Sequence, residues 1–178
     1  MPTSRAGTSS NRRPSCRGFT LMELLVVIAL LGLVAVIALP RLTVSHALEL
    51  NRSARQLAAT IRYVQDRAIT GKTPHRIRLE PGTGTVRVTR LLADGTEGST
   101  GESFLDRPLP AEGVTVADVT TSRGGKVTTG EVVLRFDMAG LGDFTAIHLR
   151  GEDDAAMTVM AYPSGKVTVS EGYVEEPQ

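Results

Sequence analysis

Two patterns of hydrophobic spacing divide the chain. From Leu24 to Leu39 every residue is apolar or glycine, and the segment that begins at Phe19 is 21 residues long. As an α-helix this segment measures about 31 Å, at about 1.5 Å per residue, which matches the roughly 30 Å hydrocarbon core of a bilayer. The pattern predicts a transmembrane helix over residues 19–39, with the single carboxylate of Glu23 near its start.

A second pattern, with apolar residues spaced alternately by four and three, predicts an amphipathic helix over residues 41–70. Pro40 lies between the two patterns and is expected to kink or locally melt the helix, because proline removes a backbone hydrogen bond and crowds the preceding turn. Gly71 and Pro74 are the predicted stop signal. The apolar positions of this helix are Leu50, Ala54, Leu57, Ile61, Val64 and Ala68.

After residue 74 the apolar period falls to two, which is typical of strands with one buried face. Residues 75–79 and 85–89 alternate around the turn 81–84 and predict a β-hairpin. Further strands are predicted at 114–119, 131–136, 144–149, 157–162 and 166–169, and the last two are joined by a turn at Pro163-Ser164-Gly165.

The sequence therefore predicts an α+β fold, in which a long N-terminal helix packs on one antiparallel β-sheet formed by residues 75–170. The two stretches 94–101 and 122–130 are rich in Gly, Thr and Ser without periodicity, and we expect them to be mobile loops. The acidic tail 171–178 is expected to fray.

The residues that precede Phe19 are basic, with four arginines and no acidic residue. The positive-inside rule then keeps the N-terminus in the cytoplasm and places residues 40–178 on the far side of the membrane. Pro40-Arg41-Leu42 follows the apolar run, where a secretory signal would carry a small-x-small cleavage site. Cys16 also lies before Phe19, so the rest of the chain has no disulfide. The arginines are Arg5, Arg12, Arg13 and Arg17.

A carboxylate at the centre of a membrane helix costs about 2.5 to 3.5 kcal/mol and somewhat less near an end, so Glu23 is a candidate functional residue that needs a partner. The alternative is a charge tolerated by snorkelling near the helix end.

The segment Gly18-Phe19-Thr20-Leu21-Met22-Glu23-Leu24, the apolar helix and Pro40 together resemble the class III signal of type IV pilins and type II secretion pseudopilins. The resemblance implies that a prepilin peptidase removes a leader, residues 1–18, by cutting between Gly18 and Phe19, and methylates the amine of Phe19. It also implies that Glu23 pairs with the N-terminal amine of a neighbouring subunit during filament assembly. Loss of the leader lowers the formal net charge from +1 to about −3.

Later segments resemble the H-type minor pseudopilins and FimT-like pilins (the GspH/FimT family). The resemblance implies a minor pseudopilin of a type II secretion system, anchored in the bacterial inner membrane with a periplasmic domain. Its implied partners are other pilins or pseudopilins, the inner-membrane assembly platform and membrane lipid. Ser164-Gly165-Lys166 stands where members often have Thr-Gly-Arg, which keeps the turn and the charge. The other segments are 53–57, 67–69, 75–79, 136–140 and 163–167.

Two alternatives remain open. One is a FimT-like minor type IV pilin that serves pilus assembly, adhesion or DNA uptake. Binding to nucleic acid requires an exposed basic cluster, and Arg76, Arg78, Arg87 and Arg90 could form a basic strip on the predicted hairpin. The other is a membrane-anchored domain that is never cleaved and never polymerises.

No catalytic or cofactor motif stands out. His46, His75 and His148 show no spacing that would place two metal ligands on one helical face, and the glycine-rich loops lack the ending of a phosphate-binding loop. Glu152-Asp153-Asp154 could bind Ca²⁺, but three acidic residues in a polar turn are more often a solvated hairpin tip. We therefore expect no enzyme activity and no cofactor.

Overall fold

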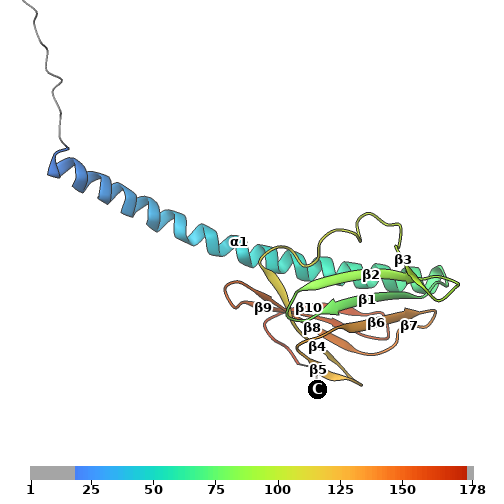
Figure 1. Cartoon of the computed structure of the whole chain (residues 1–178). Helices are drawn as coiled ribbons and strands as arrows, with labels where there is room; N and C mark the ends of the chain where they lie inside the picture. Colours follow the sequence, from blue (N-terminus) through green and yellow to red (C-terminus); the bar gives the residue numbers. More distant parts are fainter. Residues whose placement is uncertain (1–18, 176–178) are drawn as a thin grey trace, which may run out of the picture. The chain divides into compact units, whose positions relative to one another are not determined.

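A computed structural model describes residues 19–175, apart from the side chains of residues 36–46 (Figure 1). The chain divides into two compact units, Met1–Pro40 and Arg41–Gln178. Helix α1 has the bounds Leu21–Thr70, and all the described strands belong to the second unit. The side chain of Pro40 lies outside the described residues, and the kink at this position stays a prediction.

The second half of α1 is held by the apolar face that the sequence predicts. All six predicted positions are buried, and Ala58 joins them. The helix ends at Thr70, where the N–H of Gly71 donates to the carbonyl of Arg67 at 2.9 Å. Glycine commonly ends helices in this way, because it tolerates the backbone change that satisfies the last carbonyls.

The strands form two five-stranded sheets, in which every pairing is antiparallel. Sheet A has the order β3-β2-β1-β6-β7. Its strands are β1 His75–Glu80, β2 Thr85–Leu91, β3 Glu97–Gly98, β6 Val132–Asp137 and β7 Gly140–Leu141.

Sheet B has the order β10-β9-β8-β4-β5. In β4 the register shifts between Val116 and Asp118, so Ala117 has no directly opposed residue and the strand contains a bulge. The strands of sheet B are β4 Val114–Thr121, β5 Gly125–Val127, β8 Thr145–Gly151, β9 Ala156–Ala161 and β10 Val167–Glu171.

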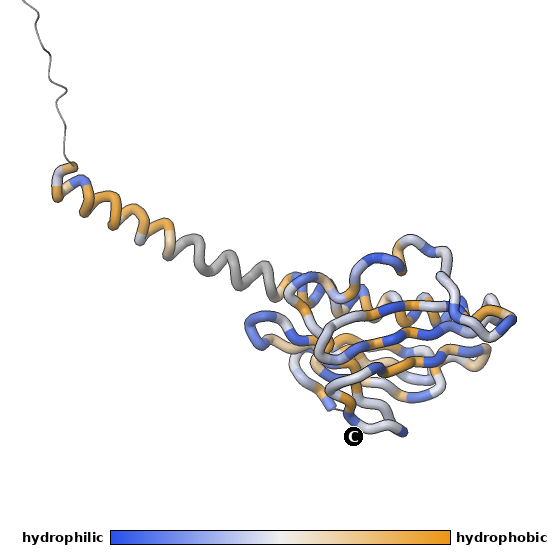
Figure 2. Tube along the Cα trace, in the orientation of Figure 1, coloured by the Kyte–Doolittle hydropathy of each residue, from blue (hydrophilic) through white to orange (hydrophobic). Residues whose placement is uncertain are grey.

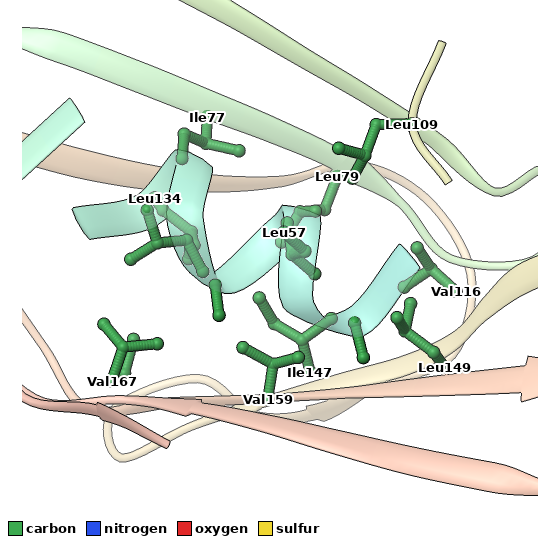
Figure 3. Packing of buried hydrophobic residues seen from close by; sticks show 14 of the residues in the cluster. Leu57, Ile77, Leu79, Leu109, Val116, Leu134, Ile147, Leu149, Val159 and Val167 are labelled. Atoms are coloured by element: carbon green, nitrogen blue, oxygen red, sulfur yellow. The ribbon is translucent and has the colours of Figure 1, made fainter. Parts of the chain in front are cut away.

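The core lies where the helix meets both sheets. In Figure 3, Leu57 of α1 lies between Ile77 and Leu134 of sheet A on one side and Ile147 and Val159 of sheet B on the other. These five side chains are at most 4% exposed. The prediction of an α+β fold with a helix on antiparallel strands is confirmed, but the prediction of one sheet is wrong, because the helix presents apolar residues to two sheets.

Three expectations about irregular segments are also wrong. The stretch 94–101 contains β3 and the stretch 122–130 contains β5, so neither is simply a mobile loop. Both strands pair with a longer neighbour, β3 with β2 and β5 with β4. The tail 171–178 was expected to fray, but in its described part Gly172 and Val174 are both hydrogen-bonded to β9; residues 176–178 lie outside the described residues.

Candidate functional site: the start of α1 and the outer face of sheet A

Helix α1 begins directly after the predicted processing site. Phe19 and Thr20 precede its first residue, Leu21. The Thr20 side-chain oxygen accepts a hydrogen bond from the N–H of Glu23 at 3.2 Å, and its carbonyl accepts from the N–H groups of Glu23 and Leu24 at 3.1 Å. Threonine is a favourable N-cap because its oxygen bonds an N–H that has no partner inside the helix. Thr20 therefore fixes the first turn, on which Glu23 lies.

Glu23 is the third residue of the helix and is exposed. The spacing Thr20-x-x-Glu23 is that of a capping box, and a carboxylate in the first turn is favoured by the helix dipole. No described residue forms an ion pair with it. The charge thus has local support from the helix start. Sequence reasoning missed the role of Thr20, although the Thr-x-x-Glu spacing was the available signal.

After Glu23, the described turns of α1 carry exposed apolar residues on all sides, and Figure 2 shows this part of the tube as predominantly hydrophobic. Phe19 is 79% exposed and Leu21 is 82% exposed. An apolar surface of this extent marks a site that meets a membrane or another protein. The exposed residues include Met22, Leu24, Leu25, Ile28, Leu30, Leu31, Leu33 and Val34.

Within the described residues, no helix is both long enough and apolar enough to cross a membrane. The predicted span 19–39 extends into residues 36–39, whose side chains lie outside the described residues. Gly18, on the far side of the predicted cleavage point, also lies outside them.

The basic strip that the sequence predicted on the hairpin does not form as expected. Arg76, Arg78 and Arg87 share the outer face of sheet A, but Arg90 stands opposite His75, on the face that also carries buried Ile77. The prediction failed for Arg90 because the register places it in the alternate set of β2 side chains.

Two arginines of this face are also neutralised. Glu97 on β3 accepts from Arg76 at 2.5 Å and from Arg78 at 2.6 Å, and Thr89 donates to it at 2.8 Å. A second carboxylate, from Glu131, bonds Arg78 at 2.5 Å. The outer face of sheet A is therefore a mixed ion-pair network, which differs from the continuous positive surface that polyanion binding requires.

These contacts change the titration of the network. The Arg78 guanidinium, followed by Thr89 and Arg76, lowers the pKa of Glu97 from its usual 4.5 to about 2. The pKa of Arg78 is raised by the same two carboxylates, Glu97 and then Glu131. Hydrogen bonding to the ionised form favours that form. Both partners thus stay charged over the ordinary pH range.

The histidines and the acidic turn do not converge. His75 lies at the start of β1 in sheet A, and its Nδ1 lies 2.7 Å from the carbonyl of Thr73, whereas His148 lies in sheet B. The side chain of His46 is outside the described residues. Residues 152–154 are exposed at the tip of the β8–β9 hairpin, as predicted. Across the described part of the chain, no three His, Cys, Asp or Glu side chains are placed to share a metal ion.

Comparison with known proteins adds a motif and a fold. The prokaryotic N-terminal methylation motif matches residues 13–39. Type II secretion system protein H of Xanthomonas campestris pathovar campestris is 37% identical over 70 residues, which are 39% of this chain and 41% of that protein. The aligned part of the chain thus spans about two fifths of the length of this curated relative.

Two solved structures of the minor pseudopilin EpsH from the type 2 secretion system of Vibrio cholerae are similar in fold. One has a TM-score of 0.57 at 16% identity and covers 71% of this chain and 97% of that chain. The other has a TM-score of 0.53 at 15% identity and covers 69% of this chain and 97% of that chain. The chain therefore has the pilin-like fold of these minor pseudopilins, and its N-terminal segment carries the methylation motif.

Proposed function

We propose that this chain, which carries the N-terminal methylation motif on the fold of the minor pseudopilins, is an H-type minor pseudopilin of a type II secretion system. In this role it is a structural subunit of the periplasmic pseudopilus that drives protein export across the outer membrane. Residues 19–39 anchor it in the inner membrane before assembly, and residues 40–178 lie in the periplasm.

The observation that carries the proposal is the match to the methylation motif over residues 13–39, directly at the N-cap of α1. Cleavage between Gly18 and Phe19 leaves Phe19 as a new N-terminus, one residue before the capping Thr20 and four before Glu23. The similarity to protein H of a type II secretion system supports the choice of system.

In this proposal, neighbouring subunits pair through charged groups at the start of α1. A new subunit contributes a carboxylate at Glu23, and its neighbour contributes the methylated amine of Phe19. In a low-dielectric environment this attraction reaches about 4 kcal/mol at a separation of 4 Å and an effective dielectric of 20, although desolvation offsets much of it. The pairing therefore sets the register between neighbouring helices, while the exposed apolar side chains of α1 contribute most of the contact.

The implied partners are the prepilin peptidase, other pseudopilins, the inner-membrane assembly platform and lipid. The alternative, a FimT-like pilin that takes up DNA, loses its main support because Glu97 and Glu131 neutralise Arg76 and Arg78. No observation on the described surface favours it over the secretion role.

The proposal is tested by intact mass and N-terminal sequencing of membrane-extracted protein, from cells with and without the prepilin peptidase. We expect N-methyl-Phe19 only where the peptidase is present. Export of the host's secreted proteins is then compared between a strain that lacks the chain and the same strain complemented with it. An intact Met1 terminus in both backgrounds would contradict the processing, and unchanged export would contradict the secretion role.

A further inference from the structure

The outer face of sheet B carries a buried charged cluster that the proposed function does not use. His148 of β8 is 1% exposed and Asp118 of β4 is 4% exposed. They stand directly opposite each other across the two strands, because the bulge at Ala117 brings Asp118 into register with His148. The Nδ1 of His148 lies 2.7 Å from Oδ1 of Asp118. Buried charges are costly unless they are paired and hydrogen-bonded, so this pair needs a structural reason.

The reason is a segment of chain that lies across the cluster, residues 172–175, which we call the C-terminal strap. Gly172 donates to the carbonyl of Ala156 at 2.8 Å. Thr158, which stands opposite His148 on β9, donates to the carbonyl of Gly172 at 2.7 Å and accepts from the N–H of Val174 at 2.9 Å. The strap is thus hydrogen-bonded to β9 through both Gly172 and Val174.

The strap also bonds the charged pair itself. The carbonyl of Val174 lies 3.0 Å from Nε2 of His148. The Tyr173 ring stacks on the imidazole at 3.7 Å and an interplanar angle of 11°, and its hydroxyl donates to Asp118 at 3.1 Å. The side chains of His148 and Asp118 are therefore each hydrogen-bonded to the strap.

The two ring nitrogens of His148 both face acceptors. A backbone carbonyl can only accept, so Nε2 must carry a hydrogen, and an ionised carboxylate can only accept, so Nδ1 must carry one too. A neutral imidazole has a single N–H, whereas the imidazolium has two. The arrangement around His148 is therefore fully satisfied only when the ring is protonated.

We propose that His148 is a proton-dependent latch, whose imidazolium joins Asp118 to Val174 and holds the C-terminal strap on sheet B. When the ring loses its proton, one of its two nitrogens no longer carries a hydrogen. The acceptor opposite that nitrogen, either the Asp118 carboxylate or the Val174 carbonyl, then faces a nitrogen lone pair, and that hydrogen bond is lost. The docked strap favours the protonated ring, so docking is strongest at low pH and weakens as pH rises through the range in which histidine titrates.

Charged groups from β4, β5 and the strap also lie in this cluster. Asp118 is a carboxylate from β4, and Lys126 from β5 lies 3.8 Å from it and 4.8 Å from the centre of the Tyr173 ring. The pKa of Lys126 is raised by the Tyr173 hydroxyl and then by Asp118. From β9 the facing residue is Thr158, which does not titrate, and Glu175 of the strap also contributes to the raised pKa of Lys126. Of the residue types in this cluster, histidine is the one that ordinarily changes charge near neutral pH.

Release of the strap would uncover apolar surface. Val174 packs with Tyr162 against a small cluster of Phe144, Ala146 and Met160 on the outer face of sheet B. With the latch open, this cluster loses part of its cover. The state of His148 thus decides whether the strap covers this cluster.

Hydrogen exchange on the full chain in detergent tests the latch. The protection of the C-terminal peptide, corrected for the intrinsic pH dependence of exchange, is measured between pH 5.5 and 8.5. We expect it to fall by about tenfold or more, as the loss of a hydrogen bond to a charged group implies. In His148→Gln the side chain has no charge, and both of its N–H donors are on one nitrogen, so it cannot place a donor at the positions of both ring nitrogens. Protection should therefore be low and independent of pH.

His75→Gln is the matched control, because His75 is also a buried histidine in a strand but lies in sheet A. It should keep the pH profile of the parent. A parent profile that is flat with pH, or a His148→Gln chain that keeps the parent profile, would overturn the latch.

If His148→Gln loses protection in β8 and so fails to fold, the parent chain still decides the matter. Nitrogen NMR of its three histidines reports the protonation of each ring. A doubly protonated His148 at pH 5.5 that titrates together with strap protection supports the latch. A neutral His148 under a protected strap would rule it out.

Discussion

Two glycines, one in β7 and one in the β9–β10 turn, leave room for the same buried glutamine of α1. A Cβ placed on Gly140 of β7 or on Gly165 of the β9–β10 turn would lie 3.0 Å from Nε2 of Gln65. Both glycines have positive φ, at 95° and 90°. They lie in the two late segments that carry the resemblance to H-type pseudopilins. The sequence predicted a turn at residues 163–165, but it could not show that Gly140 and Gly165 both lie near one side chain of the helix.

Gly140→Ala is expected to destabilise the fold for two separate reasons. A side chain at this φ costs about 1 to 2 kcal/mol, and its Cβ must displace the Gln65 amide, which is 6% exposed. Gly95→Ala is the control, because Gly95 has a similar φ of 83° but no atom within 4 Å of the added Cβ. Denaturant unfolding of the full chain should show the larger loss for Gly140→Ala. Equal losses would mean that the contact with Gln65 contributes nothing.

The short strands show why part of the fold was invisible in the sequence. β3 and β7 have two residues and β5 has three, which is too few to display a period of two. Glu97 of β3 is hydrogen-bonded to Arg78, 19 positions earlier in the chain, and Lys126 of β5 lies 3.8 Å from Asp118. Such long-range ion pairs cannot be read from local composition. The longer strands were predicted because four or more alternating residues reveal the buried face.

The ion-pair network that holds β3 predicts a specific acid sensitivity. The pKa of Glu97 is about 2 in the fold and 4.5 when unperturbed. A depressed pKa contributes stability above pH 4.5, and this contribution is lost as the pH falls towards 2. We therefore expect the parent to be more stable than Glu97→Gln at pH 6 and the two to converge near pH 2, as measured by thermal unfolding.

Glu112→Gln provides the reference for this comparison, since Glu112 is exposed and forms no ion pair with any described residue. Its difference from the parent should be small and should vary little with pH. A Glu97→Gln difference that persists unchanged at pH 2 would show that the network does not act through the carboxylate charge.

Some features of the chain depend on residues that are close together in the sequence, and others depend on contacts between distant segments. The processing and assembly residues that we predict lie close together, from Gly18 to Glu23, so the sequence alone is enough to make that prediction. The two-sheet arrangement, the bulge at Ala117 and the docked strap depend on contacts between distant segments, so local pattern could not predict them. Glu23 belongs to the first kind, yet the structure adds a second possible role for it, because it also occupies the third position of a helix capped by Thr20.

Two substitutions at Glu23 separate the assembly role from the capping role. A capping box accepts glutamine as well as glutamate, so Glu23→Gln keeps the helix start and removes the charge, while Glu23→Leu removes both. If the carboxylate pairs with the amine of a neighbouring subunit, both variants should be processed normally to Phe19 and both should fail to enter filaments. The measurement is mass spectrometry of processed protein in membranes and in sheared filaments.

Normal incorporation of Glu23→Gln with failure of Glu23→Leu would assign Glu23 to the helix cap. Incorporation of both variants would leave its charge as one tolerated by snorkelling. Glu49→Gln is the control for loss of a carboxylate elsewhere on α1, because Glu49 pairs only weakly with Arg52 at 3.8 Å; an exposed pair of this kind contributes about 0 to 1 kcal/mol. Glu49→Gln should be processed and incorporated like the parent. A defect seen only in the Glu23 variants is then due to the position of that carboxylate at the start of α1.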